Sequence, residues 1–201
     1  MGRPASAEER RLFGRYLDLL LQWNRVHRLT GLEAPSAIVR ELFRDSLLFL
    51  TRLPLGPLRL ADIGAGAGIP GVPLRIVRPD ISLTLIESKR KSVSFLESLK
   101  RELGMPDVRV LEGRAEELLR SDPELSGQFD VVVTRAVGPL RRLLPVARRY
   151  LRPGGRFIAS GPPPGATDSW STPESPVDVE ALHVPELDLR RTFLTASTED
   201  S

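Results

Sequence analysis

Strand-like and helical patterns alternate along the chain from Leu58 onward, and this alternation limits the possible folds more than any other feature. It implies a doubly wound sheet with right-handed crossovers, so we expect an α/β fold with a mostly parallel, seven-stranded sheet. The predicted strands are Leu58–Ile63, Ile81–Ile86, Val108–Leu111, Phe129–Thr134, Arg156–Ala159, Val179–His183 and Arg191–Thr195. The predicted helices are Pro73–Val77, Lys89–Leu103, Ala115–Arg120 and Pro139–Tyr150.

The sequence ahead of Leu58 predicts a helical extension. Ser6 and Glu9 form the pattern of a capping box, and apolar residues then recur at helical spacing, which predicts a helix from Ala7 to Val26. A second helical pattern continues until Leu53-Pro54 ends it. We expect both helices to cover one edge or face of the sheet. The expected division is residues 1–57 for the extension and residues 58–201 for the main domain.

Two segments near the carboxyl end indicate irregular structure. The motif Leu151-Arg152-Pro153-Gly154-Gly155 is typical of a helix stop followed by a turn into the next strand. The segment Gly161–Pro176 is rich in Pro, Gly, Ser and Thr, which predicts an irregular loop before the last two strands.

A glycine-rich turn, Asp62-Ile63-Gly64-Ala65-Gly66-Ala67-Gly68, begins at the end of the first predicted strand. Open α/β sheets bind ligands at the carboxyl ends of their strands, and glycines let a ligand approach the backbone closely. The spacing is neither G-x-G-x-x-G nor a P-loop, and Asp62 repels phosphate but can balance a cation such as the sulfonium of S-adenosylmethionine. For the motif alone, a structural interpretation in which Gly64, Gly66 and Gly68 only relieve backbone strain is about equally supported.

Glu87 favours a nucleoside ligand. It follows the second predicted strand, about 20 residues after Gly68, where an acidic side chain suits hydrogen bonds to a ribose diol. The same carboxylate also suits the start of the next helix, for which Ser88 is a candidate cap, because acidic groups are favourable near a helix N-terminus. The two roles are compatible.

The composition excludes several kinds of site and leaves nucleic acid open as a partner. The chain has no cysteine and two histidines, which excludes disulfides, thiolate nucleophiles and cysteine zinc sites and leaves little room for a histidine-rich metal site. No transmembrane span or signal peptide is visible, so we expect a cytoplasmic, metal-free enzyme. Lys plus Arg total 29 and are mostly arginine, which suits RNA recognition, although surface arginines are commonly solvated or paired. The arginines of the extension that admit either interpretation are Arg10, Arg11, Arg15, Arg25, Arg28, Arg40 and Arg44.

A series of short motifs carries a specific resemblance. They are Trp23-Asn24, Leu29-Thr30, Asp45-Ser46, Asp62-x-Gly64-x-Gly66-x-Gly68-x-Pro70-Gly71-x-Pro73-Leu74, Ile76-Val77-Arg78-Pro79, Arg114-Ala115-Glu116-Glu117 and Thr134-Arg135-Ala136. Together they resemble the GidB/RsmG family, in an order that extends from about Leu12 to Thr195. The run from Pro70 to Ile76 is much more discriminating than the glycines alone.

The resemblance implies a fold, an activity and a set of site residues. Members of the family are bacterial enzymes with a Rossmann-like class I methyltransferase fold that methylate N7 of one guanine in small-subunit (16S) ribosomal RNA, using S-adenosylmethionine. The implied partner is the small-subunit ribosomal RNA or its assembly intermediate, with no membrane, no metal and a monomeric protein. The implied cofactor-binding residues are Asp62, Gly64, Gly66, Gly68, Ile69, Glu87, Ser88, Lys89, Ala115, Glu116 and Arg135.

Arg135 is the candidate catalytic residue. It follows the fourth predicted strand and is expected to project toward the cleft, where a charged residue is more often functional than structural. Guanine N7 has an in-plane lone pair and carries no proton that must leave, so we nominate no general base. Arg135 is instead expected to position the base by contacting guanine O6 or a phosphate.

Departures from the family pattern lie on the RNA side. Arg28 stands where relatives usually carry Asn, and Glu41–Arg44 lack the Arg-His pair that relatives tend to carry ahead of Asp45. Ser160 stands where a Lys typically precedes Gly. Two alternatives therefore stay open: a methyltransferase-like protein that binds the cofactor or RNA with a different RNA target or no activity, and a small-molecule methyltransferase.

Overall fold

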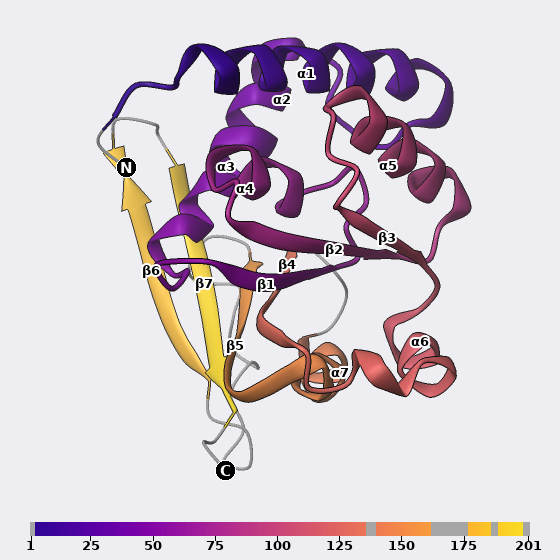
Figure 1. Ribbon diagram of the computed structural model, residues 1–201. Helices are drawn as coiled ribbons and strands as arrows, with labels where there is room; N and C mark the ends of the chain where they lie inside the picture. The colour runs from indigo at the N-terminus through magenta and orange to yellow at the C-terminus, as the bar shows by residue number, and fades with distance from the viewer. Residues whose placement is uncertain (1–2, 136–139, 162–176, 186–188, 199–201) are drawn as a thin grey trace.

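A seven-stranded sheet forms the centre of the protein in the computed structural model, which describes residues 3–135, 140–161, 177–185 and 189–198 (Figure 1). The strands are β1 (Leu58–Ile63), β2 (Ile81–Glu87), β3 (Arg109–Glu112), β4 (Phe129–Arg135), β5 (Leu151–Gly161), β6 (Asp178–Val184) and β7 (Leu189–Ser197). Their order is β3-β2-β1-β4-β5-β7-β6, and β7 runs antiparallel to both of its neighbours. The other pairs are parallel, which confirms the predicted mostly parallel, doubly wound sheet.

Strand β5 begins earlier than the sequence predicts. Leu151 already pairs with Phe129 of β4, whereas the next paired residues are Val131 and Arg156. The intervening Pro-Gly-Gly stretch forms an irregularity within the strand, and Gly154 has a φ of 71°. The prediction of a turn ahead of this strand is therefore wrong, because the turn-forming residues occupy a bulge inside the strand.

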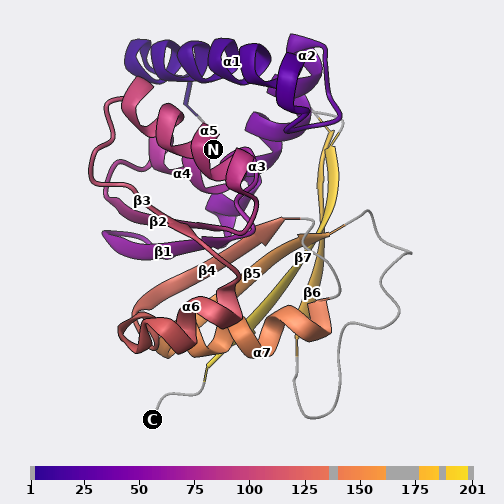
Figure 2. The same cartoon turned by 90° about the vertical axis from the view of Figure 1, so that its right-hand side faces the viewer.

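One face of the sheet is covered by the extension and two crossover helices (Figure 2). The elements are α1 (Ala7–His27), α2 (Pro35–Ile38), the π-helical turn η1 (Val39–Arg44), α3 (Asp45–Leu47), the 3-10 turn η2 (Leu48–Thr51), α4 (Gly71–Val77) and α5 (Arg90–Glu102). Tyr16 of α1 is fully buried, and its ring centroid lies 4.6 Å from that of Phe43 and 6.5 Å from that of Phe95. The extension therefore shares one apolar core with the sheet.

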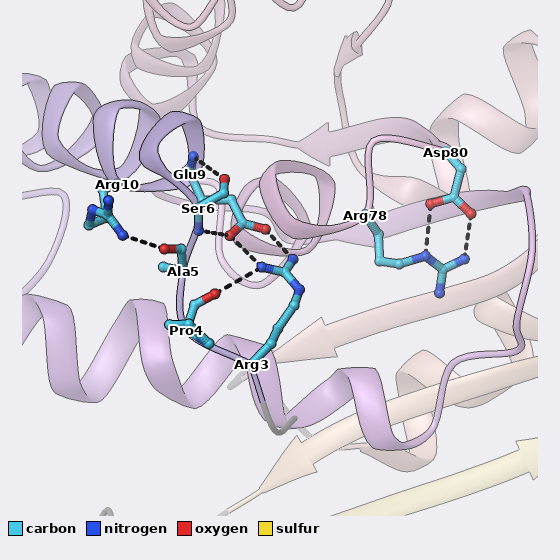
Figure 3. A network of polar contacts seen from close by, with 8 residues as sticks. All are labelled: Arg3, Pro4, Ala5, Ser6, Glu9, Arg10, Arg78 and Asp80. Carbon is cyan, nitrogen blue, oxygen red and sulfur yellow. Dashed lines mark hydrogen bonds and ion pairs between the residues drawn. The ribbon is translucent and has the colours of Figure 1, made fainter.

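Helix α1 begins with the predicted capping box (Figure 3). The Ser6 hydroxyl accepts a hydrogen bond from the Glu9 amide at 3.1 Å, and the Glu9 carboxylate accepts one from the Ser6 amide at 2.7 Å. Arg3 also contacts this carboxylate, and these interactions lower the pKa of Glu9 to about 2. The helix then extends to His27, one residue beyond the predicted end at Val26.

The opposite face is covered by three elements, α6 (Ala115–Ser121), the 3-10 turn η3 (Pro123–Leu125) and α7 (Leu140–Tyr150) (Figure 2). Buried residues of α7 recur at helical spacing at Leu143, Leu144, Ala147 and Tyr150, and they pack with Phe129 of the sheet. Helices on both faces leave the carboxyl ends of the parallel strands as the open edge, where α/β proteins bind ligands.

The last two strands form a hairpin close to the predicted positions. Their register runs from Asp178 opposite Thr195 to Val184 opposite Leu189. The predicted irregular loop lies outside the described residues, except for Gly161, which ends β5. In the described part of the chain, no helix combines the length and the apolar character needed to cross a membrane.

Candidate functional site

Three adjoining hollows, which we call the strand-end cleft, lie at the carboxyl ends of β1, β2 and β4. Their volumes are about 170, 170 and 390 Å³, and Gly64 lines all three. The predicted site residues that line this cleft are Gly64, Gly66, Ile69, Glu87, Ser88, Lys89, Ala115, Glu116 and Arg135. The structure therefore brings together all the predicted site residues except Asp62 and Gly68.

The glycine turn forms one wall of the cleft. Gly64 and Gly66 have φ angles of 76° and 56°, in the left-handed region that favours glycine. The amides of Gly64 and Ala65 donate to the Ile86 carbonyl at 2.8 and 3.1 Å, which fixes the turn against β2. A Cβ on Gly66 would meet only the Gly64 carbonyl oxygen, 3.8 Å away, so the turn also leaves space for a ligand. The structural role of these two glycines is therefore clear, and their role in ligand binding stays a prediction.

Gly68 faces the protein core instead of the cleft. Its φ is 86°, and a Cβ placed there would lie 2.9 Å from the Tyr16 hydroxyl and 2.9 Å from Val72. The Tyr16 hydroxyl donates a hydrogen bond to the Ala67 carbonyl, which joins α1 to the glycine turn. The sequence pattern indicates only that Tyr16 lies on the apolar face of α1. A buried tyrosine hydroxyl needs a partner, but the sequence does not say which one.

Asp62 lies behind the glycine turn. Its side chain is fully buried and accepts a hydrogen bond from the Gly71 amide, 2.8 Å away, at the start of α4. Burial raises the pKa of Asp62 to about 7; the Gly71 amide opposes this rise, and the negative charge of Glu87 adds to it. The carboxyl group therefore fixes the turn against α4 and does not line the cleft. The sequence, in contrast, predicts that Asp62 directly balances the charge of a cationic ligand.

Replacing Asp62 by asparagine is expected to change how stability depends on pH. The folded-state pKa of about 7 lies above the ordinary 3.8, so Asp62 stabilises the fold below about pH 4 and loses this contribution as pH rises through 7. A shift of this size corresponds to about 4 kcal/mol. Asparagine keeps an acceptor for Gly71 but does not titrate. Urea denaturation across this range should show the wild type losing stability relative to the variant, and a constant difference would contradict the assignment.

Glu87 connects the glycine turn to the start of α5. Its side chain is buried; Oε2 accepts from the Gly66 amide at 2.8 Å, and Oε1 accepts from the Lys89 amide at 2.7 Å. A carboxylate has about four lone-pair sites, so these two contacts leave acceptor capacity for a pair of hydroxyl groups. The predicted Ser88 cap is wrong, because Lys89 directly precedes α5 and no side chain caps the helix.

The start of α6 forms another wall of the cleft. Ala115 and Glu116 line the same hollow as Ser88. The Tyr150 hydroxyl donates to the Ala115 carbonyl at 2.8 Å, which fixes α6 against α7. The Gly113 amide donates to the Glu87 carbonyl at 2.9 Å and joins the end of β3 to β2. In the described part of the chain, no group of His, Asp and Glu has the arrangement of a metal site.

Arg135 ends β4 and lines two of the three hollows. Its Nε atom lies 2.9 Å from Oδ2 of Asp45, and its Nη2 atom donates to the Glu41 carbonyl at 2.8 Å. Glu41 lies within the π-helical turn η1, and Asp45 is the first residue after η1. Turns of this kind are frequent at functional sites. The extension therefore holds the candidate catalytic arginine at the cleft.

Asp45 is shared by two arginines. Its side chain is fully buried, and Oδ1 lies 2.5 Å from Nε of Arg191 on β7. The guanidinium groups lie close to the carboxylate without the alignment of regular hydrogen bonds, so the attraction is mainly between charges. Burial raises the pKa of Asp45, and Arg135 and Arg191 oppose this rise. One carboxylate for two guanidinium groups leaves surplus positive charge beside the cleft.

Sequence reasoning missed several residues at this edge. Leu29, Thr30 and Leu42 line the cleft together with Arg135. The motifs Leu29-Thr30 and Asp45-Ser46 are the available sequence signals, but they do not indicate a role, because the contacts depend on the path of the chain after α1. Ser160, which replaces the usual Lys, is buried and lies opposite Arg135 in the ladder between β4 and β5.

A larger hollow adjoins the cleft beyond Arg28, and we call it the outer hollow. Its volume is about 780 Å³. Arg28 and Thr30 line both the outer hollow and the strand-end cleft, so the two meet there. The residues of the outer hollow are Leu21, Asn24, Arg25, Arg28, Thr30, Gly31, Glu33 and Pro35. It lies away from the strand ends, so the smaller cleft is the candidate site for chemistry.

Known proteins resemble this chain in sequence. The family model GidB, described as rRNA small subunit methyltransferase G, matches residues 9–161. A "Ribosomal RNA small subunit methyltransferase G" of Caldanaerobacter subterraneus subsp. tengcongensis is 41% identical over 148 residues, covering 73% of this chain and 62% of that protein. A relative of the same name in Streptococcus pyogenes is 37% identical over 160 residues, covering 79% and 67%. The chain thus spans about two thirds of the length of these curated relatives.

A solved structure supports the fold. A SAM dependent methyltransferase from Aquifex aeolicus superimposes with a TM-score of 0.58 at 18% identity, covering 85% of this chain and 96% of that chain. At this identity the likeness concerns the fold alone, a Rossmann-like methyltransferase. The family model, in contrast, matches most of the sequence, including the strand ends that build the cleft. The chain belongs to the GidB family, that of rRNA small subunit methyltransferase G.

Proposed function

We propose that the protein transfers a methyl group from S-adenosylmethionine to N7 of a guanine in small-subunit ribosomal RNA. The observation that carries this proposal is the strand-end cleft, where Gly64, Glu87 and Arg135 meet from three strand ends in a chain of this family. Bacterial ribosomal RNA is made in the cytoplasm, so the proposal places the protein there.

The cleft residues fit the chemical groups of S-adenosylmethionine. Gly66 leaves space beside the backbone for the methionine part, Gly64 lines the same hollows, and Glu87 has free acceptor sites for the two ribose hydroxyls. Ala115 and Glu116 border a hollow of about 170 Å³ that suits the adenine ring. When bound, S-adenosylmethionine supplies an activated methyl group on its sulfonium. Asp62 would act on this site through the position of the glycine turn.

Catalysis in this proposal comes from positioning. Guanine N7 offers an in-plane lone pair and loses no proton, so the cleft needs no general base. The protein must instead hold N7 in line with the methyl group and exclude water, which lowers the barrier through proximity and orientation. The position of Arg135 supports this role, because Arg135 lines the cleft and its guanidinium group is held by Asp45 and Glu41. Its planar donor fork matches guanine O6 or a phosphate.

A second candidate function is binding of the cofactor or of RNA without this transfer. Two observations favour it: Leu42 presents an apolar side chain to the cleft in the segment where relatives carry a basic pair, and Ser160 replaces the usual lysine beside Arg135. A small-molecule substrate is the third possibility, and the cations at the mouth of the cleft argue against an apolar one.

Transfer of a radiolabelled methyl group tests the proposal. The purified protein is incubated with labelled S-adenosylmethionine and small-subunit ribosomal RNA that lacks its own modifications, and the labelled nucleoside is identified by mass. We expect N7-methylguanosine at one position. Label in another nucleoside would show that the target is not guanine N7. Cofactor binding without transfer would favour the second candidate function.

Arg135→Ala is expected to lower kcat/KM for RNA by about 100-fold, because a misplaced base loses most of the benefit of orientation. Folding should change much less, since Asp45 keeps Arg191 as a partner. Arg135→Lys should recover only part of the activity, because lysine keeps the charge but loses the donor fork. Arg142→Ala, at an exposed site on α7, is the matched control. Wild-type turnover in Arg135→Ala would remove the proposed role.

A further inference from the structure

Cations without acidic partners gather where the outer hollow meets the strand-end cleft. Arg25 and Arg28 line the outer hollow, and Arg28, Lys89 and Lys91 line the cleft. Within the described residues, no ion pair joins any of these four side chains to a carboxylate. Lys91 donates to the His27 carbonyl at 2.9 Å, which brings the start of α5 to the end of α1. The four cations therefore lie along one continuous surface.

Several other arginines of the extension are paired with carboxylates. On α1, Arg11 pairs with Glu8 at 2.7 Å and Arg15 pairs with Glu102 at 2.8 Å. Figure 3 shows a further pair of the extension, Arg3 with Glu9, next to the pair of Arg78 with Asp80, which lies outside the extension. The two interpretations of the extension's arginines therefore apply to different residues. Arg11 and Arg15 are paired surface groups, whereas Arg25 and Arg28, at the end of α1, have no carboxylate partner among the described residues.

The outer hollow is preformed by local hydrogen bonds. Asn24 is buried; its Nδ2 atom donates to the Leu32 carbonyl at 3.0 Å, and its Oδ1 atom accepts from the Thr30 amide at 2.9 Å. The Thr30 hydroxyl accepts from the Leu32 amide at 3.1 Å. These bonds hold the chain after α1 in a fixed turn around the hollow. A ligand therefore meets a surface that is already ordered, which reduces the entropy lost on binding.

Two of the cations stand where local preferences oppose them. Arg28 has a φ of 46°, a left-handed conformation that is unfavourable for a side chain such as arginine. Lys91 lies in the first turn of α5, which contains no acidic residue, although a helix N-terminus favours negative charge. Local preferences are often broken where function requires it.

The cations do not match the charge of the cofactor. S-adenosylmethionine carries a carboxylate, an ammonium and a sulfonium group, so its net charge is positive and it would be repelled by a cationic rim. The acidic residues of the two surfaces are Glu33, which lines the outer hollow, Glu116, which lines the hollow at the start of α6, and Glu87, whose carboxylate oxygens accept backbone hydrogen bonds. The free cations outnumber them and suit a polyanion.

We propose that the outer hollow and the Arg28 junction bind backbone phosphates of the RNA strand that flanks the target guanine. The proposal rests on the proposed function. A guanine must be unpaired to present N7 at the bottom of a cleft, so its neighbours pass the rim as single-stranded nucleotides. The outer hollow adjoins the cleft through Arg28 and gives these nucleotides a cationic path.

Salt dependence of RNA binding tests this proposal. Binding of an unmodified transcript of small-subunit ribosomal RNA is measured by fluorescence anisotropy between about 50 and 200 mM salt, for the wild type, Arg25→Gln and the double variant Arg25→Gln/Arg28→Asn. The slope of log affinity against log salt should fall in magnitude by about 1 for the single and about 2 for the double variant. The matched control is Arg101→Gln/Arg120→Gln, which removes two exposed cations away from the two hollows.

Two further readouts separate the proposal from unfolding and from failure of the proposed function. Asparagine tolerates the left-handed conformation, so Arg28→Asn should leave the melting temperature unchanged or higher while RNA affinity falls. Cofactor affinity, measured by calorimetry, should not change in Arg25→Gln. Slopes equal to those of the control variant would overturn the RNA surface while leaving methyl transfer untouched. Reduced slopes in a protein that transfers no methyl group would support the surface and overturn only the proposed chemistry.

Discussion

Replacing Gly64 by arginine is expected to abolish binding of S-adenosylmethionine, raising its Kd by at least about 100-fold. Gly64 lines each of the three hollows of the strand-end cleft, so any side chain there enters the space for the ligand. An arginine side chain would fill part of this space, and its cation would repel the sulfonium. The left-handed φ of 76° adds strain of about 1–2 kcal/mol.

Gly104→Arg separates the loss of space from the strain. Gly104 has a φ of 66°, and a Cβ there would meet nothing within 4 Å. It follows α5 at the end opposite Lys89 and lines none of the hollows of the cleft. Both variants should lose similar stability, whereas only Gly64→Arg should lose the heat of cofactor binding in calorimetry. Retained affinity in Gly64→Arg would overturn the placement of the cofactor.

Asp45→Ala is expected to lower the free energy of unfolding by about 3 kcal/mol, because it leaves two guanidinium groups side by side without a counter-charge. The Asp45 side chain is fully buried, whereas those of Arg135 and Arg191 each keep 21% exposure. Partial access to water places the loss at the low end of the range for buried ion pairs. Because Arg135 also loses its anchor, methyl transfer should fall together with stability.

Urea denaturation with a double-mutant cycle measures this effect. Asp45→Ala, Arg135→Ala and the double variant together give the coupling between the two groups, which should be large and favourable. Asp45→Asn keeps an acceptor oxygen and should lose less stability than Asp45→Ala. Glu8→Ala breaks the exposed pair with Arg11 and should change stability little. A stable Asp45→Ala with unchanged turnover would show that the carboxylate does not position Arg135.

The fold and much of the cleft are local properties of the sequence. The run Leu58–Ile63 is mostly apolar and directly precedes a glycine-rich turn, and the structure has a strand with these bounds. Glycines at alternate positions then permit left-handed backbone, which the turn at the end of β1 uses. The site residues Gly64 and Glu87 could be placed because strand ends of a parallel sheet share one edge.

Contacts between distant segments are what the sequence could not provide. Arg135 is held by the carbonyl of Glu41, 94 positions away along the chain. Nothing in the local pattern around Asp45 indicates that one carboxylate serves both β4 and β7. Asp62 shows the opposite case, in which the local pattern suggests a ligand contact that the packing prevents. The direction of its side chain depends on where α4 packs, and its carboxylate accepts a hydrogen bond from the Gly71 amide.

The hydroxyl of Tyr16 has a consequence for how this fold can be divided or recombined. It binds the carbonyl of Ala67, so helix α1 forms part of the support of the glycine turn. A fragment that starts at β1 would lack this support and would expose the apolar residues that α1 covers. In a chimaera of two relatives, α1 and the glycine turn should therefore come from the same parent protein.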